Sequence, residues 1–141
     1  MRGFLVGKLS SQERLRIVGE VGDGAEAVDT AKQLKPDLVL LDIGLPTLNG
    51  IEVCRRIRDA SPTTKILFVS ENSSSDIAEE ALRCGGLGYV VKSDAGTDLL
   101  PAVEAVIQGK RFLSASLTGH LLVAATLIAM QALGVSWLLL M

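Results

Sequence analysis

The feature that most constrains the fold is the run of five residues at 37–41, which ends at Asp42. After Asp37 the run contains only leucine and valine, without the apolar–polar alternation of a strand that has one face in water. Such a continuous apolar run is typical of a parallel strand that is buried on both faces. The sequence therefore predicts a central strand of a parallel sheet, with a carboxylate at its carboxyl end.

Other segments repeat this pattern, because short β-type runs alternate with amphipathic stretches along the chain. The runs that predict further strands are 15–21, 65–70 and 88–91. The stretches that predict helices are 24–34, capped by Asp23, then 51–59, a helix that starts at 73–76 and stops at Gly85-Gly86, and 97–108. This alternation predicts the α/β class, a doubly wound parallel sheet with helices on both faces.

Composition agrees with one globular domain in a chain of 141 residues. The hydrophobic content of 48% excludes a disordered chain, and a net charge of −2 gives no basic footprint for nucleic acid or for an anionic membrane surface. Cys54 and Cys84 lie in predicted helices, far from any CxxC pattern. We therefore interpret both cysteines as small buried hydrophobic residues of a protein in a reducing, cytoplasmic compartment.

The start of the chain does not supply the strand and crossover helix that should precede the strand at 15–21. If residues 4–6 formed that strand, too few residues would remain for a parallel connection, which needs about a dozen. Phe4, Leu5 and Leu9 instead fit one face of a short helix. We therefore expect the chain to begin inside the first helix, with the first strand absent.

Three polar residues follow predicted strands: Asp42, Ser70 and Lys92. In open parallel sheets, ligands bind beyond the carboxyl ends of the strands. A carboxylate can serve as the nucleophile that forms an aspartyl phosphate, while a hydroxyl and an ammonium stabilise the anionic oxygens. Each residue alone has an ordinary structural role as a cap, a strand end or a solvated charge. Together they predict a phosphoryl-transfer site.

Several spaced motifs resemble the receiver domains of two-component response regulators, in particular the LuxR-type branch. The matching segments are Ile17-Val-Gly-Glu-Val-Gly-Asp-Gly-Ala-Glu-Ala-Val28, Pro36-Asp-Leu-Val-Leu-Leu-Asp-Ile-Gly-Leu-Pro46, Asn49-Gly-Ile-Glu52, Ile66-Leu-Phe-Val-Ser70 and Gly88-Tyr-Val-Val-Lys92. The resemblance covers about residues 2–118 and implies a flavodoxin-like fold with strand order 2-1-3-4-5.

The resemblance also implies roles for individual residues. Asp42 would accept phosphate from a sensor histidine kinase, Ser70 would bind the phosphoryl group, and Lys92 would pair with it. Tyr89 matches an aromatic residue whose rotamer reports phosphorylation, although a half-buried strand aromatic is an equally good interpretation. The carbonyl of Gly44 matches a ligand of the family's Mg²⁺, and Pro46 and Gly50 would shape the adjoining loop. The resemblance implies a signalling module, possible as a homodimer, and not an enzyme.

The sequence departs from the family at the end of the first strand, where members carry two acidic residues that bind Mg²⁺. Arg2-Gly-Phe-Leu5 offers no substitute, so the metal site is expected to be incomplete, with only Asp42 and Gly44 as ligands. Phosphorylation of Asp42 is therefore expected to be impaired. The alternative is a phosphorylation-independent receiver that acts as a protein-interaction module.

The predicted domain organisation is a receiver domain over 1–113 that lacks its first strand, a linker over 114–120, and an apolar tail over 121–141. The tail contains no charged residue and meets the length criterion for a membrane-spanning helix. It is interpreted as a membrane anchor, a remnant of a longer regulator, or a helix buried against a partner. His120 is interpreted as a boundary residue. No recognition helix or basic cluster is evident, so direct DNA binding is not expected.

Overall fold

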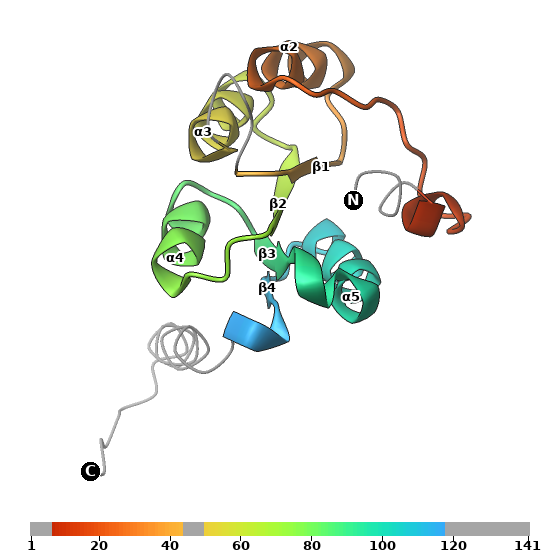
Figure 1. The fold of residues 1–141 in the computed structure, drawn as a ribbon. Helices are drawn as coiled ribbons and strands as arrows, with labels where there is room; N and C mark the ends of the chain where they lie inside the picture. The colour runs from red at the N-terminus through yellow and green to blue at the C-terminus, as the bar shows by residue number, and fades with distance from the viewer. Residues whose placement is uncertain (1–6, 44–49, 118–141) are drawn as a thin grey trace, which may run out of the picture.

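The computed structural model describes residues 7–43 and 50–117, which form one parallel sheet and its covering helices (Figure 1). Four strands lie in the order β1-β2-β3-β4, and every pair is parallel. The strands are β1 (Leu38–Leu41), β2 (Lys65–Ser70), β3 (Gly88–Val91) and β4 (Phe112–Leu113). The long helices are α2 (Gly24–Leu34), α3 (Gly50–Ala60), α4 (Ser75–Arg83) and α5 (Ala95–Ile107). The α/β class and the parallel sheet are confirmed.

The helices cover the sheet on both faces, with α3 and α4 on one side and α5 on the other (Figure 1). Successive residues of β2 alternate between these faces: Ile66 and Phe68 pack toward α3 and α4, whereas Leu67 and Val69 pack toward α5. All four side chains are at most 2% exposed. Burial on both faces explains why this strand is apolar along its whole length.

Helix ends coincide with the capping residues that the sequence contains. The Asp23 carboxylate accepts a hydrogen bond of 2.8 Å from the Ala25 amide and caps α2. The last turn of α4 is followed by Gly85, whose φ of +112° is a conformation that a side chain would strain. The predicted stop of this helix at Gly85-Gly86 is confirmed.

The predicted strand at 15–21 is wrong. None of these residues pairs with the sheet, and Ile17 and Val18 are 39% and 55% exposed. Among the described residues, β1 pairs only with β2, so no strand lies along its other edge. A β-type run becomes a strand only when its backbone groups find a ladder partner, and within the described part of the chain this segment pairs with none. The segment instead touches the core through Leu15 and Val21.

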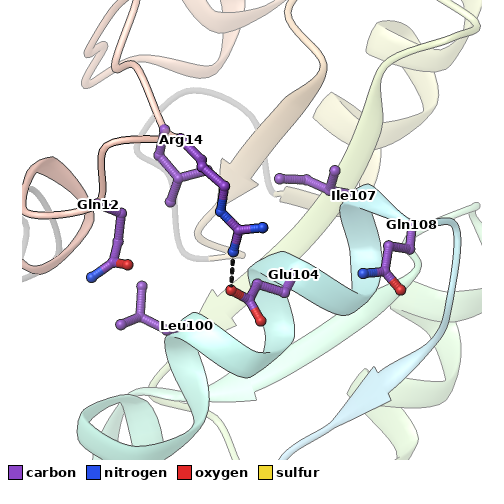
Figure 2. Close-up of a pocket in the computed structure, with 7 residues that line it drawn as sticks. Gln12, Arg14, Leu100, Glu104, Ile107 and Gln108 are labelled. Carbon is purple, nitrogen blue, oxygen red and sulfur yellow. Dashed lines mark hydrogen bonds and ion pairs between the residues drawn. The ribbon is translucent and has the colours of Figure 1, made fainter.

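A cavity of about 190 Å³ lies between residues 12–15 and the exposed side of α5 (Figure 2). Arg14 crosses it and forms an ion pair of 2.5 Å with Glu104. The two side chains are 82% and 56% exposed, so this pair contributes little to stability. Other contacts of this segment are the side chain of Leu9, which is buried in the cluster around α5, and a hydrogen bond of 2.6 Å from Lys8 Nζ to the Gly96 carbonyl.

The structure contains a strand that the sequence did not predict. Phe112 and Leu113 form β4, which extends the sheet beside β3. Ser114 is fully buried, and its hydroxyl accepts a hydrogen bond of 2.8 Å from the Val91 amide. Leu117 is also buried, so packing extends into the segment predicted as a linker. A strand of two residues has no periodicity that a sequence pattern could reveal.

The predicted apolar tail over 121–141 and His120 lie outside the described residues. None of the helices within residues 7–43 and 50–117 combines the length and hydropathy required to cross a bilayer.

We predict that an isoleucine-to-alanine substitution will cost much more unfolding free energy in the core than in the unpaired segment 15–21. Ile57→Ala should lower the free energy of unfolding by about 2–5 kcal/mol, because the side chain is fully buried in α3. Ile17→Ala should cost less than about 1 kcal/mol, because the side chain is already partly in water. Urea denaturation measures both. Equal losses would show that residues 15–21 pack like a strand.

Candidate functional site

The carboxyl ends of three neighbouring strands place Asp42, Ser70 and Lys92 at one edge of the sheet. Asp42 follows β1, Ser70 ends β2, and Lys92 follows β3 directly. The register pairs Leu41 with Phe68 and Ser70 with Val91, so the three strands end at nearly the same level. An open cavity of about 300 Å³ lies at this edge. Its lining residues are Asp42, Ile43, Ser70, Glu71, Asn72 and Lys92.

The closest contact in this site is the ion pair between Asp42 and Lys92. The Lys92 Nζ donates to Asp42 Oδ2 at 2.6 Å, across 50 residues of sequence. The Lys92 side chain is 16% exposed and that of Asp42 is 38% exposed. A short, charge-assisted hydrogen bond between partly buried groups fixes both side chains while leaving the carboxylate reachable from solvent. The ammonium is therefore placed where an anionic group on Asp42 would need a counter-charge.

Ser70 lies deeper in the same cavity and is 4% exposed. Its Oγ accepts a hydrogen bond of 3.2 Å from the Asn72 amide and also interacts with the Tyr89 hydroxyl. A serine hydroxyl has one hydrogen to donate and two lone pairs, so it can stabilise an anionic oxygen. The three residues that the sequence predicted as a group are brought together around one cavity.

Tyr89 connects this site to the start of the loop before α4. Its ring is fully buried, with the centroid 6.3 Å from that of Phe68. Its hydroxyl donates to the Asn72 carbonyl at 2.7 Å. Burial raises the pKa of Tyr89, and the negative charge of Asp42 raises it further, whereas the hydrogen bond with Ser70 acts in the opposite direction. The side chain therefore bridges β3 and the segment that follows Ser70.

Gly50 sets the distance between the start of α3 and the end of β1. Its amide donates to the Ile43 carbonyl at 2.8 Å. A Cβ at this position would lie 2.6 Å from the Asp42 carbonyl oxygen, so only glycine allows this approach. Gly44 and Pro46, the other loop residues singled out in the sequence, lie outside the described residues.

Sequence reasoning did not identify Glu71 and Asn72, which also line the cavity. The sequence does place both residues directly after the strand that ends in Ser70, and this position could have indicated that they line the same cavity. Asn72 is fixed by its own contacts, since its Oδ1 accepts a hydrogen bond of 2.8 Å from the Ser74 amide. Neither residue belongs to the motifs on which the resemblance depends.

The described residues offer a poor set of ligands for Mg²⁺, which prefers oxygen atoms in octahedral geometry. Asp42 is the less exposed of the two carboxylates that line the cavity, and Lys92 already binds one of its oxygens. Glu71 supplies a second carboxylate from an exposed position. Within residues 7–43 and 50–117, no three Asp, Glu, His or Cys side chains cluster as a metal site would require.

Comparison with known proteins identifies one family across most of this chain. The model of the response regulator receiver domain matches residues 2–104. The chain is 34% identical over 124 residues to the nitrate/nitrite response regulator protein NarL of Escherichia coli K12, covering 88% of this chain and 56% of NarL. It is 36% identical over 113 residues to the DNA-binding transcriptional activator DevR/DosR of Mycobacterium tuberculosis, covering 80% and 52%. The chain thus spans about half the length of these curated relatives.

Solved structures agree with the sequence comparison. A two-component response regulator of the LuxR family from Aurantimonas sp. SI85-9A1 superposes with a TM-score of 0.75 and 31% identity, covering 85% of this chain and 88% of that chain. The isolated receiver domain of RcsB from Salmonella enterica serovar Typhimurium, solved with phosphomimetic BeF₃⁻, gives a TM-score of 0.74 and 27% identity, covering 82% and 86%.

We predict that Tyr89→Phe will lower the free energy of unfolding by about 1 kcal/mol at neutral pH, because it removes the hydrogen bond to Asn72. The pKa of Tyr89 is raised in the folded state above its ordinary value of 10.0, so its protonated phenol stabilises the fold below that pH. This stabilisation is lost as the pH rises through the higher folded-state pKa. The gap between wild type and variant should therefore narrow above about pH 10.

Urea denaturation of both proteins at a series of pH values measures this gap. A gap that stays constant or widens through the alkaline range would contradict the assigned environment of the phenol.

Proposed function

This chain belongs to the response regulator receiver domain family, and from that membership we propose that Asp42 accepts the phosphoryl group in a two-component phosphorelay. The observation that carries the proposal is the short contact between Lys92 and Asp42 at the edge of the sheet where Ser70 also ends its strand. Receiver domains are signalling modules that interact with histidine kinases. The proposed phosphodonor is accordingly the phosphohistidine of a sensor histidine kinase.

The proposed chemistry is a transfer between two side chains. An Asp42 carboxylate oxygen attacks the phosphorus of phosphohistidine, an oxygen–phosphorus bond forms, and the nitrogen–phosphorus bond breaks. The electron pair of the broken bond remains on the imidazole, which takes up a proton. Lys92 shifts from the carboxylate to the new phosphoryl oxygens, and the Ser70 hydroxyl donates to another of them. Neither shift requires a change in the strands that carry these residues.

Receiver domains generally use Mg²⁺ at the phosphorylation site, where the metal neutralises charge on the phosphoryl group. For this chain we propose weak Mg²⁺ binding and slow transfer. The support is the donor set described above, in which the less exposed carboxylate, that of Asp42, is already paired with Lys92. The ammonium supplies part of the positive charge that the metal would otherwise provide.

Tyr89 is proposed to communicate the state of the site to the surface formed by α4 and β3. It interacts with Ser70 inside the cavity and holds the Asn72 carbonyl in the loop before α4. When Ser70 turns toward a phosphoryl group, its interaction with the phenol is lost. Because the Tyr89 hydroxyl is also bound to the Asn72 carbonyl, the tyrosine ring and the loop are then expected to move together.

The proposed location of the protein is the cytoplasm, where sensor kinases carry their phosphohistidines. The proposed oligomeric state includes a homodimer. Direct DNA binding is not proposed for this chain, although a relative bears the name of a DNA-binding activator. The proposed domain organisation is a receiver unit over 1–113, a segment 114–120 whose Ser114 and Leu117 pack against that unit, and the apolar segment 121–141.

A second candidate function is a protein-interaction module that works without phosphorylation. The specific observation in its favour is that Lys92 already neutralises Asp42 in the unmodified chain. The site is therefore in a charge-paired state before any phosphoryl group arrives. A partner that recognises the surface of α4 and β3 would then bind without a phosphorylation step.

We predict that a phosphohistidine kinase or acetyl phosphate with Mg²⁺ will add one phosphoryl group to the wild-type chain, and that Asp42→Asn will abolish the addition. Asp37→Asn is the matched control, because Asp37 lies at the opposite end of the same strand and is exposed. Transfer should be at least about tenfold slower than in a receiver with a full metal site. Intact mass spectrometry and base lability of the adduct measure the outcome. A wild-type chain that remains unlabelled would exclude the phospho-acceptor proposal.

The second candidate predicts that Asp42→Asn will leave the affinity for a captured kinase or regulator within about twofold of the wild-type value, because the contact surface lies away from the carboxylate. Titration calorimetry with the wild-type and variant chains checks this. A loss of about tenfold or more in the variant would assign binding to the phospho-acceptor state instead.

A further inference from the structure

Two cysteines that are 30 residues apart in the sequence lie against each other in the structure. Cys54 is in α3, and Cys84 is the C-cap of α4. The Cys54 Sγ donates to the Cys84 carbonyl at 3.6 Å, and the Cys84 Sγ donates to the Ala81 carbonyl at 3.0 Å. The two thiols also influence each other's ionisation. Both cysteines are unbridged.

The environments of the two thiols differ in exposure. Cys54 is fully buried in the core on the α3 and α4 side of the sheet, whereas Cys84 is partly open to solvent. Arg58 lies beside Cys84, because its Nη1 donates to the Gly85 carbonyl at 3.0 Å. Small oxidants can therefore reach Cys84, which lies next to a cationic group, whereas the buried Cys54 is not accessible to them.

The same asymmetry applies to ionisation. A hydrogen bond from the Cys54 thiol, together with the Gly86 amide and the charges of Arg55 and Arg58, lowers the pKa of Cys84 to about 7, against the opposing effect of burial. The pKa of Cys54 is raised, first by its hydrogen bond with Cys84 and then by burial. A thiolate that is partly exposed and next to arginine is the reactive form of cysteine, whereas a buried thiol is inert on its own.

We propose that Cys54 and Cys84 are a peroxide-oxidised pair, in which Cys84 is attacked first and Cys54 then closes a reversible disulfide between α3 and the end of α4. The oxidant is a hydroperoxide. Disulfides of this kind in a reducing compartment are transient and serve as sensors. The proposal stands independently of whether Asp42 is phosphorylated.

The reaction balances in two steps. The Cys84 thiolate attacks a peroxide oxygen, a sulfur–oxygen bond forms, the oxygen–oxygen bond breaks, and the leaving hydroxide takes a proton to become water. Cys84 is thereby oxidised by two electrons to a sulfenic acid. The Cys54 sulfur then attacks the Cys84 sulfur, the sulfur–oxygen bond breaks, and water leaves with the Cys54 proton. In total, two thiols and one hydrogen peroxide give one disulfide and two waters.

The bond would restrain the helix that follows the candidate site. A disulfide has a sulfur–sulfur length of about 2.05 Å, and the Cys54 sulfur, which already lies 3.6 Å from the Cys84 carbonyl oxygen, would approach the Cys84 sulfur as the bond forms. The other end of α4 follows the loop whose Asn72 carbonyl is held by Tyr89. Oxidation would therefore fix one end of α4 to α3 while the other end stays connected to the cavity.

The test treats the full-length wild-type chain with hydrogen peroxide and maps the products by mass spectrometry without reduction. The expected result is the loss of two hydrogens, a single cross-linked peptide that contains residues 54 and 84, and full reversal by dithiothreitol. Accumulation of sulfinic or sulfonic acid at Cys84 without this cross-link, or a disulfide between two chains, would overturn the proposal.

Two variants test the assigned order of reaction. Cys54→Ser should leave a sulfenic acid at Cys84 that dimedone captures, because the resolving thiol is gone. Cys84→Ser should slow oxidation of Cys54 at least about tenfold, because that thiol is buried. Circular dichroism confirms that each variant is folded before the comparison. Equal oxidation rates in the two variants would contradict Cys84 as the site of first attack.

Discussion

The parallel pairing of β1, β2 and β3 is the constraint on which the rest of the structure depends. These ladders bring Asp42, Ser70 and Lys92 from three distant parts of the chain to one edge of the sheet. The side chains of β2 alternate between two fully packed faces, so a shift of the register by one residue would place each side chain on the wrong face. Core packing and the placement of the three site residues are therefore fixed by the same backbone hydrogen bonds.

The electrostatics of the site follow from this arrangement. Lys92 is less exposed than Asp42, so the ammonium is held by the protein while the carboxylate remains open to a partner. Tyr89 and Ser70 extend the polar contacts from the cavity into the loop before α4. On the same side of the sheet, α4 ends at Cys84, next to Cys54. Helix α4 thus has the loop beside the proposed phosphorylation site before its first turn and the proposed redox pair at its end, and the two proposals together predict that either reaction affects its position.

The limits of prediction are clearest before α2 and after α5. Residues 15–21 have the composition of a strand, but a strand forms only where another strand lies within hydrogen-bonding reach, and the pattern of one segment contains no information about which segment lies beside it. The opposite error occurs at Phe112 and Leu113, which form β4 without any periodic signal because the edge of β3 offers them a ladder. In both places the pairing of strands in the tertiary structure, and not local sequence preference, decided whether the segment forms a strand.

The sequence by itself determined the α/β class, the strands that end at Asp42 and Ser70, the strand before Lys92, and the helix stop at Gly85. Each of these has a local physical cause, namely a continuous apolar run, a capping side chain or a residue that tolerates positive φ. Only the tertiary structure decided the ion pair of Asp42 with Lys92, the contact of Tyr89 with Asn72 and the approach of Cys54 to Cys84. These contacts join residues 17–50 positions apart, and such distances close only when the sheet and its helices have packed.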